Sequence, residues 1–149
     1  MARSVGASCD PADVEVSATD VERIPPGNLR VPRDEFVAVW ALAEELAHGD
    51  WYAVGVVRTC RWVAGAMVPG LPALGGRPEP ARAPVTWDAT RAHEELIELE
   101  AEAADRWLAR YPHGLKGRPG FLEAIVVTLD WVWRGSGRPP LDVRRSAAG

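Results

Sequence analysis

Two similar stretches, "TCRWVAG" (residues 59–65) and "TLDWVWRG" (residues 128–135), decide how this sequence is expected to fold. Each places a Trp three residues after a Thr, follows the Trp with Val, and runs on to a Gly. When Tyr52 is placed over Phe121, the surrounding residues align without a gap. The apolar positions of one stretch then fall on the apolar positions of the other, at the spacing of an amphipathic helix.

The residues that precede the two stretches resemble each other as well. "EFVAVWALA" (residues 35–43) aligns with "ELIELEAEA" (residues 95–103) at a different offset, which a longer loop in the second half would absorb. Two interpretations remain open. Either a helical hairpin was duplicated in tandem, or two unrelated amphipathic helices share the same apolar face.

Apolar periodicity and helix-end signals predict four helices. Pro32 suits the first turn of a helix, Gly49 is a natural helix terminator, and Asp50 is a good N-cap. The predicted helices cover about residues 33–47, 51–68, 88–110 and 121–134. Because a single hairpin cannot cover its own apolar stripe, we expect an all-α four-helix bundle of two tandem hairpins.

This bundle predicts a simple division of the chain. The expected parts are an extended or flexible arm (1–31), a hairpin (33–68), a Pro/Gly loop (69–87), a second hairpin (88–135) and a flexible tail (136–149). In the two repeated stretches, Thr59 and Thr128 are expected to bond back to the carbonyl one turn earlier. Trp62 and Trp131 are expected to be half-buried rings at the bundle edge.

Composition narrows the class of protein. The chain has 149 residues, of which 47% are hydrophobic and 26% charged, as in one ordinary globular domain. A net charge of −4 argues against nucleic acid as a partner. No apolar segment is long enough to span a membrane, and no secretory signal is evident, so we expect a cytoplasmic protein. The Arg-, Ala-, Gly- and Pro-rich usage suggests a high-GC bacterium.

One candidate ligand site follows from Glu100, which lies inside the apolar stripe of the third predicted helix. His93 lies two turns earlier on nearly the same side. A buried carboxylate needs a partner, and Arg33 or Arg118 is the expected one. The alternatives are a polar ligand pocket, a buried salt bridge, or an exposed edge of the stripe.

A second candidate is a protein-interaction surface, because the chain has seven Trp residues and Trp is enriched at interfaces. The proposed surface consists of Trp51, Trp62, Trp87, Trp131 and Trp133. Uncovered apolar edges of the hairpins also favour self-association, commonly as a twofold dimer.

Catalytic and metal signals are weak. Glu45 and His48 form an E-x-x-H pair, but the second such pair that a di-iron bundle needs is missing. Cys60 lies in mid-stripe, where a buried thiol is inert, and Cys9 stands in a polar context. We therefore expect no metal, cofactor or catalytic residue. The sequence favours a non-enzymatic interaction or accessory module, with a small-molecule-binding bundle or small enzyme around Glu100 and His93 as the alternative.

Overall fold

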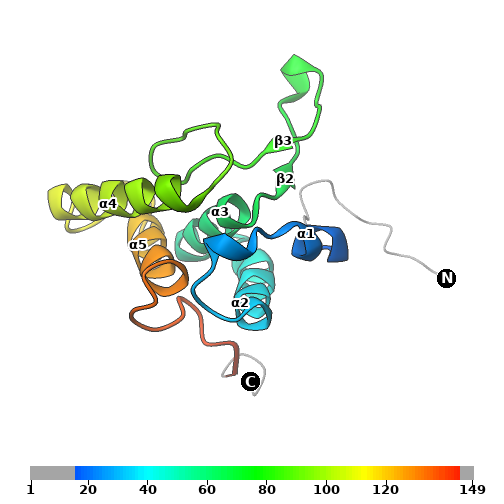
Figure 1. Ribbon diagram of the computed structural model, residues 1–149. Coiled ribbons are helices and arrows are strands. Elements are labelled where there is room, and N and C mark those ends of the chain that lie inside the picture. Colours follow the sequence, from blue (N-terminus) through cyan, green and yellow to red (C-terminus); the bar gives the residue numbers. More distant parts are fainter. Residues whose placement is uncertain (1–15, 145–149) are drawn as a thin grey trace.

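The structure, a computed structural model, describes residues 16–144 (Figure 1). Its α-helices are α1 (Ala18–Arg23), α2 (Arg33–Leu46), α3 (Trp51–Ala64), α4 (Glu94–Arg110) and α5 (Phe121–Val132). The short elements are the 3-10 turns η1 (Pro26–Asn28) and η2 (Pro72–Leu74) and the strands β2 (Met67–Val68) and β3 (Glu79–Pro80). The described chain is therefore mostly helical, with one small antiparallel two-stranded sheet.

Local signals explain where α2 ends and α3 begins and ends. Gly49 has a φ of +86°, and the Asp50 side chain accepts the Tyr52 N–H at 3.0 Å, so the predicted terminator and N-cap are confirmed. α3 ends earlier than predicted because Gly65, with a φ of +68°, forms a left-handed C-cap. The residues that follow pair as β2 and β3, inside and beside the segment expected to be an irregular loop.

The start of α4 also differs from the prediction. The helix begins at Glu94, after the N-cap His93, and not near Asp88. The Asp88 carboxylate accepts the N–H of Thr90 at 2.7 Å, a local turn that competes with helix formation. Residues between 81 and 93 therefore form a loop, and this loop builds one wall of the candidate site described below.

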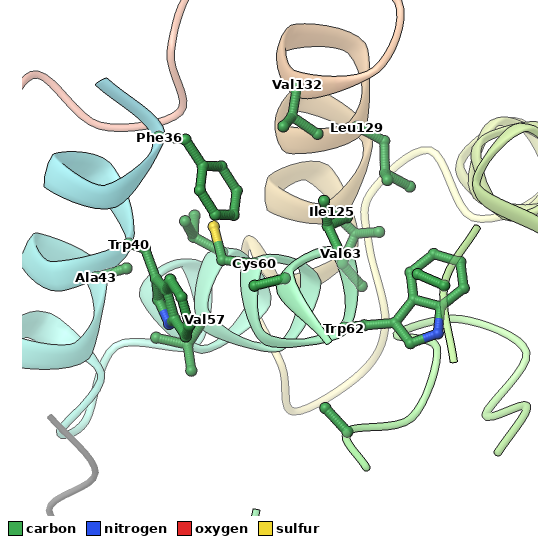
Figure 2. Close-up of a cluster of buried hydrophobic side chains, with 14 of the residues drawn as sticks. Phe36, Trp40, Ala43, Val57, Cys60, Trp62, Val63, Ile125, Leu129 and Val132 are labelled. Carbon is green, nitrogen blue, oxygen red and sulfur yellow. The ribbon is translucent and has the colours of Figure 1, made fainter. Parts of the chain in front are cut away.

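The core is organised around α3, which packs most extensively on α5, while α2 packs on α3 and α4 packs on α5. Figure 2 shows Phe36 and Trp40 of α2 against α3, with Ile125 and Leu129 of α5 behind it. Gly55 allows the close approach of α3 and α5. A Cβ there would lie 2.5 Å from the Phe121 carbonyl oxygen and 2.8 Å from the Ala124 Cβ.

The segment expected to be an extended arm is structured over its described part. Ser17 and Asp20 form a capping box that starts α1. The buried Asn28 side chain donates to the carbonyl oxygens of Val63 at 2.9 Å and Ala92 at 3.1 Å. These two bonds tie the segment to α3 and to the loop before α4, which periodicity does not reveal. Residues 1–15 of the predicted arm lie outside the described residues.

The predicted flexible tail likewise returns to the body of the protein. Pro140 is buried, and its carbonyl oxygen accepts the Tyr52 hydroxyl at 3.0 Å. Residues 145–149 of the predicted tail lie outside the described residues.

Side-chain predictions within the helices had mixed outcomes. The Thr59 hydroxyl donates to the Gly55 carbonyl at 2.8 Å and that of Thr128 to the Ala124 carbonyl at 2.6 Å, which confirms both expected bonds. Apolar periodicity places Leu96, Leu99, Ala103 and Trp107 on the buried face of α4, but of these four only Ala103 is buried. Leu99 and Trp107 are 57% and 42% exposed, because α4 packs through smaller side chains. The residues it buries are Ile97, Glu100, Ala101, Ala103 and Ala104.

Candidate functional site

Glu100 is buried, but its partners are not those that the sequence suggested. Its Oε2 atom accepts the backbone N–H groups of Val85 at 2.6 Å and Thr86 at 2.9 Å. Its Oε1 atom accepts the Thr86 hydroxyl at 2.8 Å. The side chain is only 3% exposed, and three donors from one loop satisfy it. Glu100 therefore fastens the loop before α4 to the middle of that helix.

The structure does not bring the four residues of the predicted ligand pocket together. His93 is exposed at the N-terminus of α4, and the Arg33 side chain is exposed and donates to the Ile24 carbonyl at 3.4 Å. Arg118 lies over the rings of Trp51 and Phe121. Within residues 16–144, none of the three forms a hydrogen bond or ion pair with the Glu100 carboxylate.

The loop that Glu100 holds presents Trp87 in an unusual conformation. Trp87 has a φ of +65°, and its N–H donates to the Ala83 carbonyl at 3.1 Å. For a bulky residue this left-handed geometry costs about 1–3 kcal/mol, and such strain clusters at functional sites. Because the indole is also 52% exposed, core packing does not account for a Trp here.

Trp87 lies at the rim of a small cleft between α3, α4, α5 and this loop. We call it the arginine cleft; its volume is about 150 Å³. It is lined by Arg58, Pro84, Val85, Trp87, Trp107, Leu115, Arg118, Phe121, Leu122 and Ile125. Trp87 and Trp107 are exposed, whereas Phe121, Leu122 and Ile125 are buried. The cleft therefore has an aromatic rim and an apolar floor.

Two guanidinium groups alternate with aromatic rings around the cleft. Arg58 lies 5.3 Å from the Trp87 ring centroid and 5.7 Å from that of Phe121. Arg118 lies 5.6 Å from the Phe121 centroid and 5.2 Å from that of Trp51. Such cation–π contacts attract the cation to the ring but leave its N–H donors unsatisfied.

The two arginines also lack any acidic partner. In the described part of the chain, neither side chain makes a hydrogen bond or an ion pair. Burial of Arg58, followed by repulsion from Arg118 and Arg61, lowers the pKa of its guanidinium. A half-buried cation near another cation is costly unless an anion joins it. The arrangement is therefore suited to binding an anionic group.

The lining of the cleft consists of cationic, aromatic and aliphatic side chains. None of the lining residues is a Ser, Cys, His, Asp or Glu, the usual nucleophiles and general bases. Cys60 is buried elsewhere in the core, as expected, and burial raises the pKa of its thiol. Among residues 16–144, no three His, Cys, Asp or Glu side chains gather to hold a metal ion.

A larger hollow of about 800 Å³ lies between α2 and the C-terminal segment. Charges of both signs line it: Asp34 and Glu35 on α2, and Arg138 and Arg144 on the segment. Opposite charges in one hollow offset each other, so it selects no particular ionic ligand. The arginine cleft carries one sign of charge only, and we therefore take the smaller cleft as the candidate site.

The five Trp residues predicted to form an interaction surface have different environments. Trp62 and Trp131 are only 1% and 5% exposed, so their assignment to a surface was wrong. The Trp62 indole N–H donates to the Thr90 carbonyl at 3.2 Å, and Trp131 stacks on Phe36. Both rings fill the core because tertiary packing covers the helix flanks that periodicity leaves exposed.

The remaining three predicted residues are at least partly accessible. Trp87 is the exposed one; Trp51 packs edge-on to Phe121, and Trp133 donates its indole N–H to Glu98 at 3.2 Å. Trp107 is a further exposed indole, one that the sequence does not single out. Its spacing fits an apolar stripe equally well, so no local signal distinguishes it.

Comparison of the chain with protein-family models, curated protein sequences and solved structures gives no match. No helix in the described range is both long enough and apolar enough to cross a bilayer.

Proposed function

We propose that this protein is a non-enzymatic interaction module whose arginine cleft recognises an acidic group on a partner protein. The observation that carries the proposal is the pair Arg58 and Arg118. Both guanidinium groups lie against aromatic rings, and neither has a carboxylate partner within residues 16–144. Arg and Trp are the side chains most enriched at the energetic centres of protein interfaces.

The surroundings of the cleft support a protein partner. Trp107 lies on the rim and Tyr111 directly follows the end of α4, with ring centroids 5.7 Å apart, and both are exposed. Such rings supply contact area around a charged anchor. The overall charge of −4 disfavours a general phosphate-backbone binder, whereas a local pair of cations still suits one acidic group.

The experiment is site-specific photo-cross-linking in the expressing cell. A photoreactive phenylalanine analogue at Trp107 is expected to capture a partner, whereas the same analogue at the exposed Leu46, on α2, is not. The captured protein is then purified, and its affinity is measured for wild type and for an Arg58→Gln/Arg118→Gln variant. We expect the variant to bind at least 10-fold more weakly, because charge-assisted hydrogen bonds are lost.

If this double variant binds the captured protein as tightly as wild type does, the proposal is wrong, whichever protein the cross-link captures. Arg106→Gln, an exposed change elsewhere on α4, is the matched control and is expected to bind normally. If Trp107 captures only a second copy of the chain, the partner is the protein itself, and the same variants then test a dimer by sedimentation.

A second part of the proposal concerns the architecture of the protein. We propose that α2–α3 and α4–α5 are the two hairpins of a four-helix bundle that arose by duplication. Thr59 and Thr128 make the same bond, and Gly55 and Ala124, which are equivalent in the alignment, meet each other where α3 crosses α5. Contact between equivalent residues is what a twofold relation between two helices produces. A high-GC bacterial cytoplasm remains the expected setting.

The alternative function, a ligand-binding bundle or small enzyme around Glu100 and His93, stays a prediction. It requires a ligand that displaces the Val85 and Thr86 donors from the Glu100 carboxylate. Native mass spectrometry of the gently purified protein tests it. A retained small-molecule mass that disappears in His93→Ala would favour this alternative over the arginine cleft.

A further inference from the structure

The size of the arginine cleft limits what enters it. A volume of about 150 Å³ equals that of an apolar cavity which admits benzene, whereas drug-sized ligands occupy roughly 300–1,000 Å³. The buried floor, formed by Phe121, Leu122 and Ile125, closes the inner end. One ring or one side chain therefore fills the cleft, and the rest of any larger ligand would lie outside it.

The walls specify the chemistry of that group. Apart from Arg58 and Arg118, the lining side chains are aliphatic or aromatic, so the body of the ligand must be apolar. The two guanidinium groups are planar forks that match the two oxygens of a carboxylate. A phosphate carries more charge and three acceptor oxygens, which an otherwise apolar cleft cannot satisfy.

Resting on the proposed function, we infer that the arginine cleft binds a carboxylate attached to a single apolar ring or side chain. The carboxylate lies between Arg58 and Arg118, and the apolar part lies against Trp87 and the floor. Two sources offer this chemistry: the C-terminal residue of a polypeptide that ends in an aromatic or aliphatic side chain, and a free single-ring aromatic acid.

The test follows the indole N–H signals in proton–nitrogen NMR spectra of the full chain. Trp87→Phe identifies the Trp87 signal, and Trp107→Phe that of Trp107. The probes are benzoate, benzamide, acetate, inorganic phosphate, and acetyl-Gly-Phe as the free acid and as the amide. We expect benzoate or the peptide acid to shift both signals in a saturable way. Benzamide, acetate, phosphate and the peptide amide are expected to bind at least 10-fold more weakly.

The relative affinities of the probes distinguish the two sources. Tighter binding of acetyl-Gly-Phe acid than of benzoate identifies a polypeptide C-terminus, in agreement with the proposed function. The reverse order identifies a free aromatic acid and contradicts the partner protein of that proposal. Equal binding of benzamide and benzoate would overturn the inference, since charge would then be irrelevant. Binding of phosphate or acetate as tight as that of benzoate would overturn it as well.

Variants tie the response to the two arginines. Arg58→Gln and Arg118→Gln are each expected to weaken benzoate or peptide-acid binding at least 10-fold. Arg58→Lys keeps the charge but loses the planar fork, so we expect it to fail too. Arg106→Gln is the control, and thermal unfolding of each variant shows that it is folded. If no probe binds while the cross-linked partner still depends on Arg58 and Arg118, this inference fails and the proposed function stands.

Discussion

Arg58 and Arg61 are one turn apart on α3 and have opposite environments. Arg61 faces α2, where its Nε and Nη2 atoms donate to Glu44 at 2.9 and 2.7 Å, and the Trp40 indole N–H donates to the same carboxylate at 3.0 Å. Arg58 faces the cleft, where rings surround it and, among residues 16–144, no acid pairs with it. The same helix thus carries a satisfied cation and an unsatisfied one.

The difference separates a contact that stabilises the fold from one that is suited to a ligand. The network of Trp40, Glu44 and Arg61 joins α2 to α3, and every charged group in it has a partner. At the cleft, Arg58 is a half-buried cation repelled by other arginines, and Trp87 has a strained backbone. Neither feature stabilises the fold. Substitutions on the side of α3 that faces α2 should therefore reduce stability more than binding. Substitutions on the side that faces the cleft should reduce binding more than stability.

The largest expected loss of stability follows Glu44→Ala. It leaves the Arg61 guanidinium and the buried Trp40 indole N–H without their acceptor. Breaking a largely buried pair in this way should lower the free energy of unfolding by about 3 kcal/mol. Urea denaturation measures the change. The neighbouring exposed Glu45→Ala is the control, and a loss no greater than that of Glu45→Ala would mean that the network does not stabilise the hairpin.

Glu100→Leu should have the next largest effect. It removes three hydrogen bonds to a carboxylate, a loss of about 2 kcal/mol after the gain from burying an apolar side chain. We also expect the Val85 and Thr86 amides to exchange with solvent at least 10-fold faster, because Glu100 is their acceptor. Amide exchange measures this directly. Unchanged protection of both amides would show that the loop is held by other contacts, and the exposed Glu102→Leu is the matched control.

Trp87→Gly should change stability little. Glycine adopts a φ of +65° without strain, which offsets the loss of cation–π contacts, so the net change should stay within about 1 kcal/mol. Binding of benzoate or the peptide acid should be lost in the same variant. Trp62→Leu gives the contrast, since truncating a fully buried indole should cost about 3 kcal/mol. A similar cost for Trp87→Gly would assign Trp87 to the core.

The smallest effect on stability is expected for Arg58→Met. This change removes a half-buried cation that Arg118 and Arg61 repel, so the free energy of unfolding should stay within about 0.5 kcal/mol or rise. Arg61→Met, by contrast, leaves the Glu44 carboxylate without its arginine partner and should destabilise the protein. Thermal denaturation of the two variants side by side sharpens the comparison. Equal destabilisation would mean that Arg58 is a structural residue.

How much of the fold and of the candidate site is predictable depends on how far along the chain each sequence signal acts. Gly49 and Asp50 set a helix boundary through their own backbone and side chain, and Thr59 and Thr128 bond within one turn, so all four were predictable. Gly65 carried an equally local signal for the end of α3, which the apolar run beyond it obscured.

The candidate site depends on contacts that no local pattern encodes. Periodicity places Glu100 within an apolar stripe without deciding whether it is buried. It is buried, and its donors come from a loop that the sequence predicted to be partly helical. Periodicity leaves Arg58 off the apolar stripe of its helix, and the sequence suggests Arg118 only as a partner for Glu100. Their shared position around Phe121 follows from the packing of α3 on α5.

By itself, the sequence determined that this chain is mostly helical, where most helices begin and end, and which buried hydroxyls bond within their own helix. These properties arise from periodicity and from hydrogen bonds between neighbours in the chain. Only the tertiary structure decided that Asn28 anchors the N-terminal segment, that Trp62 and Trp131 are core residues, and that two arginines share a cleft. Those outcomes depend on which surfaces meet when helices pack, and a side chain's identity does not specify what lies opposite it.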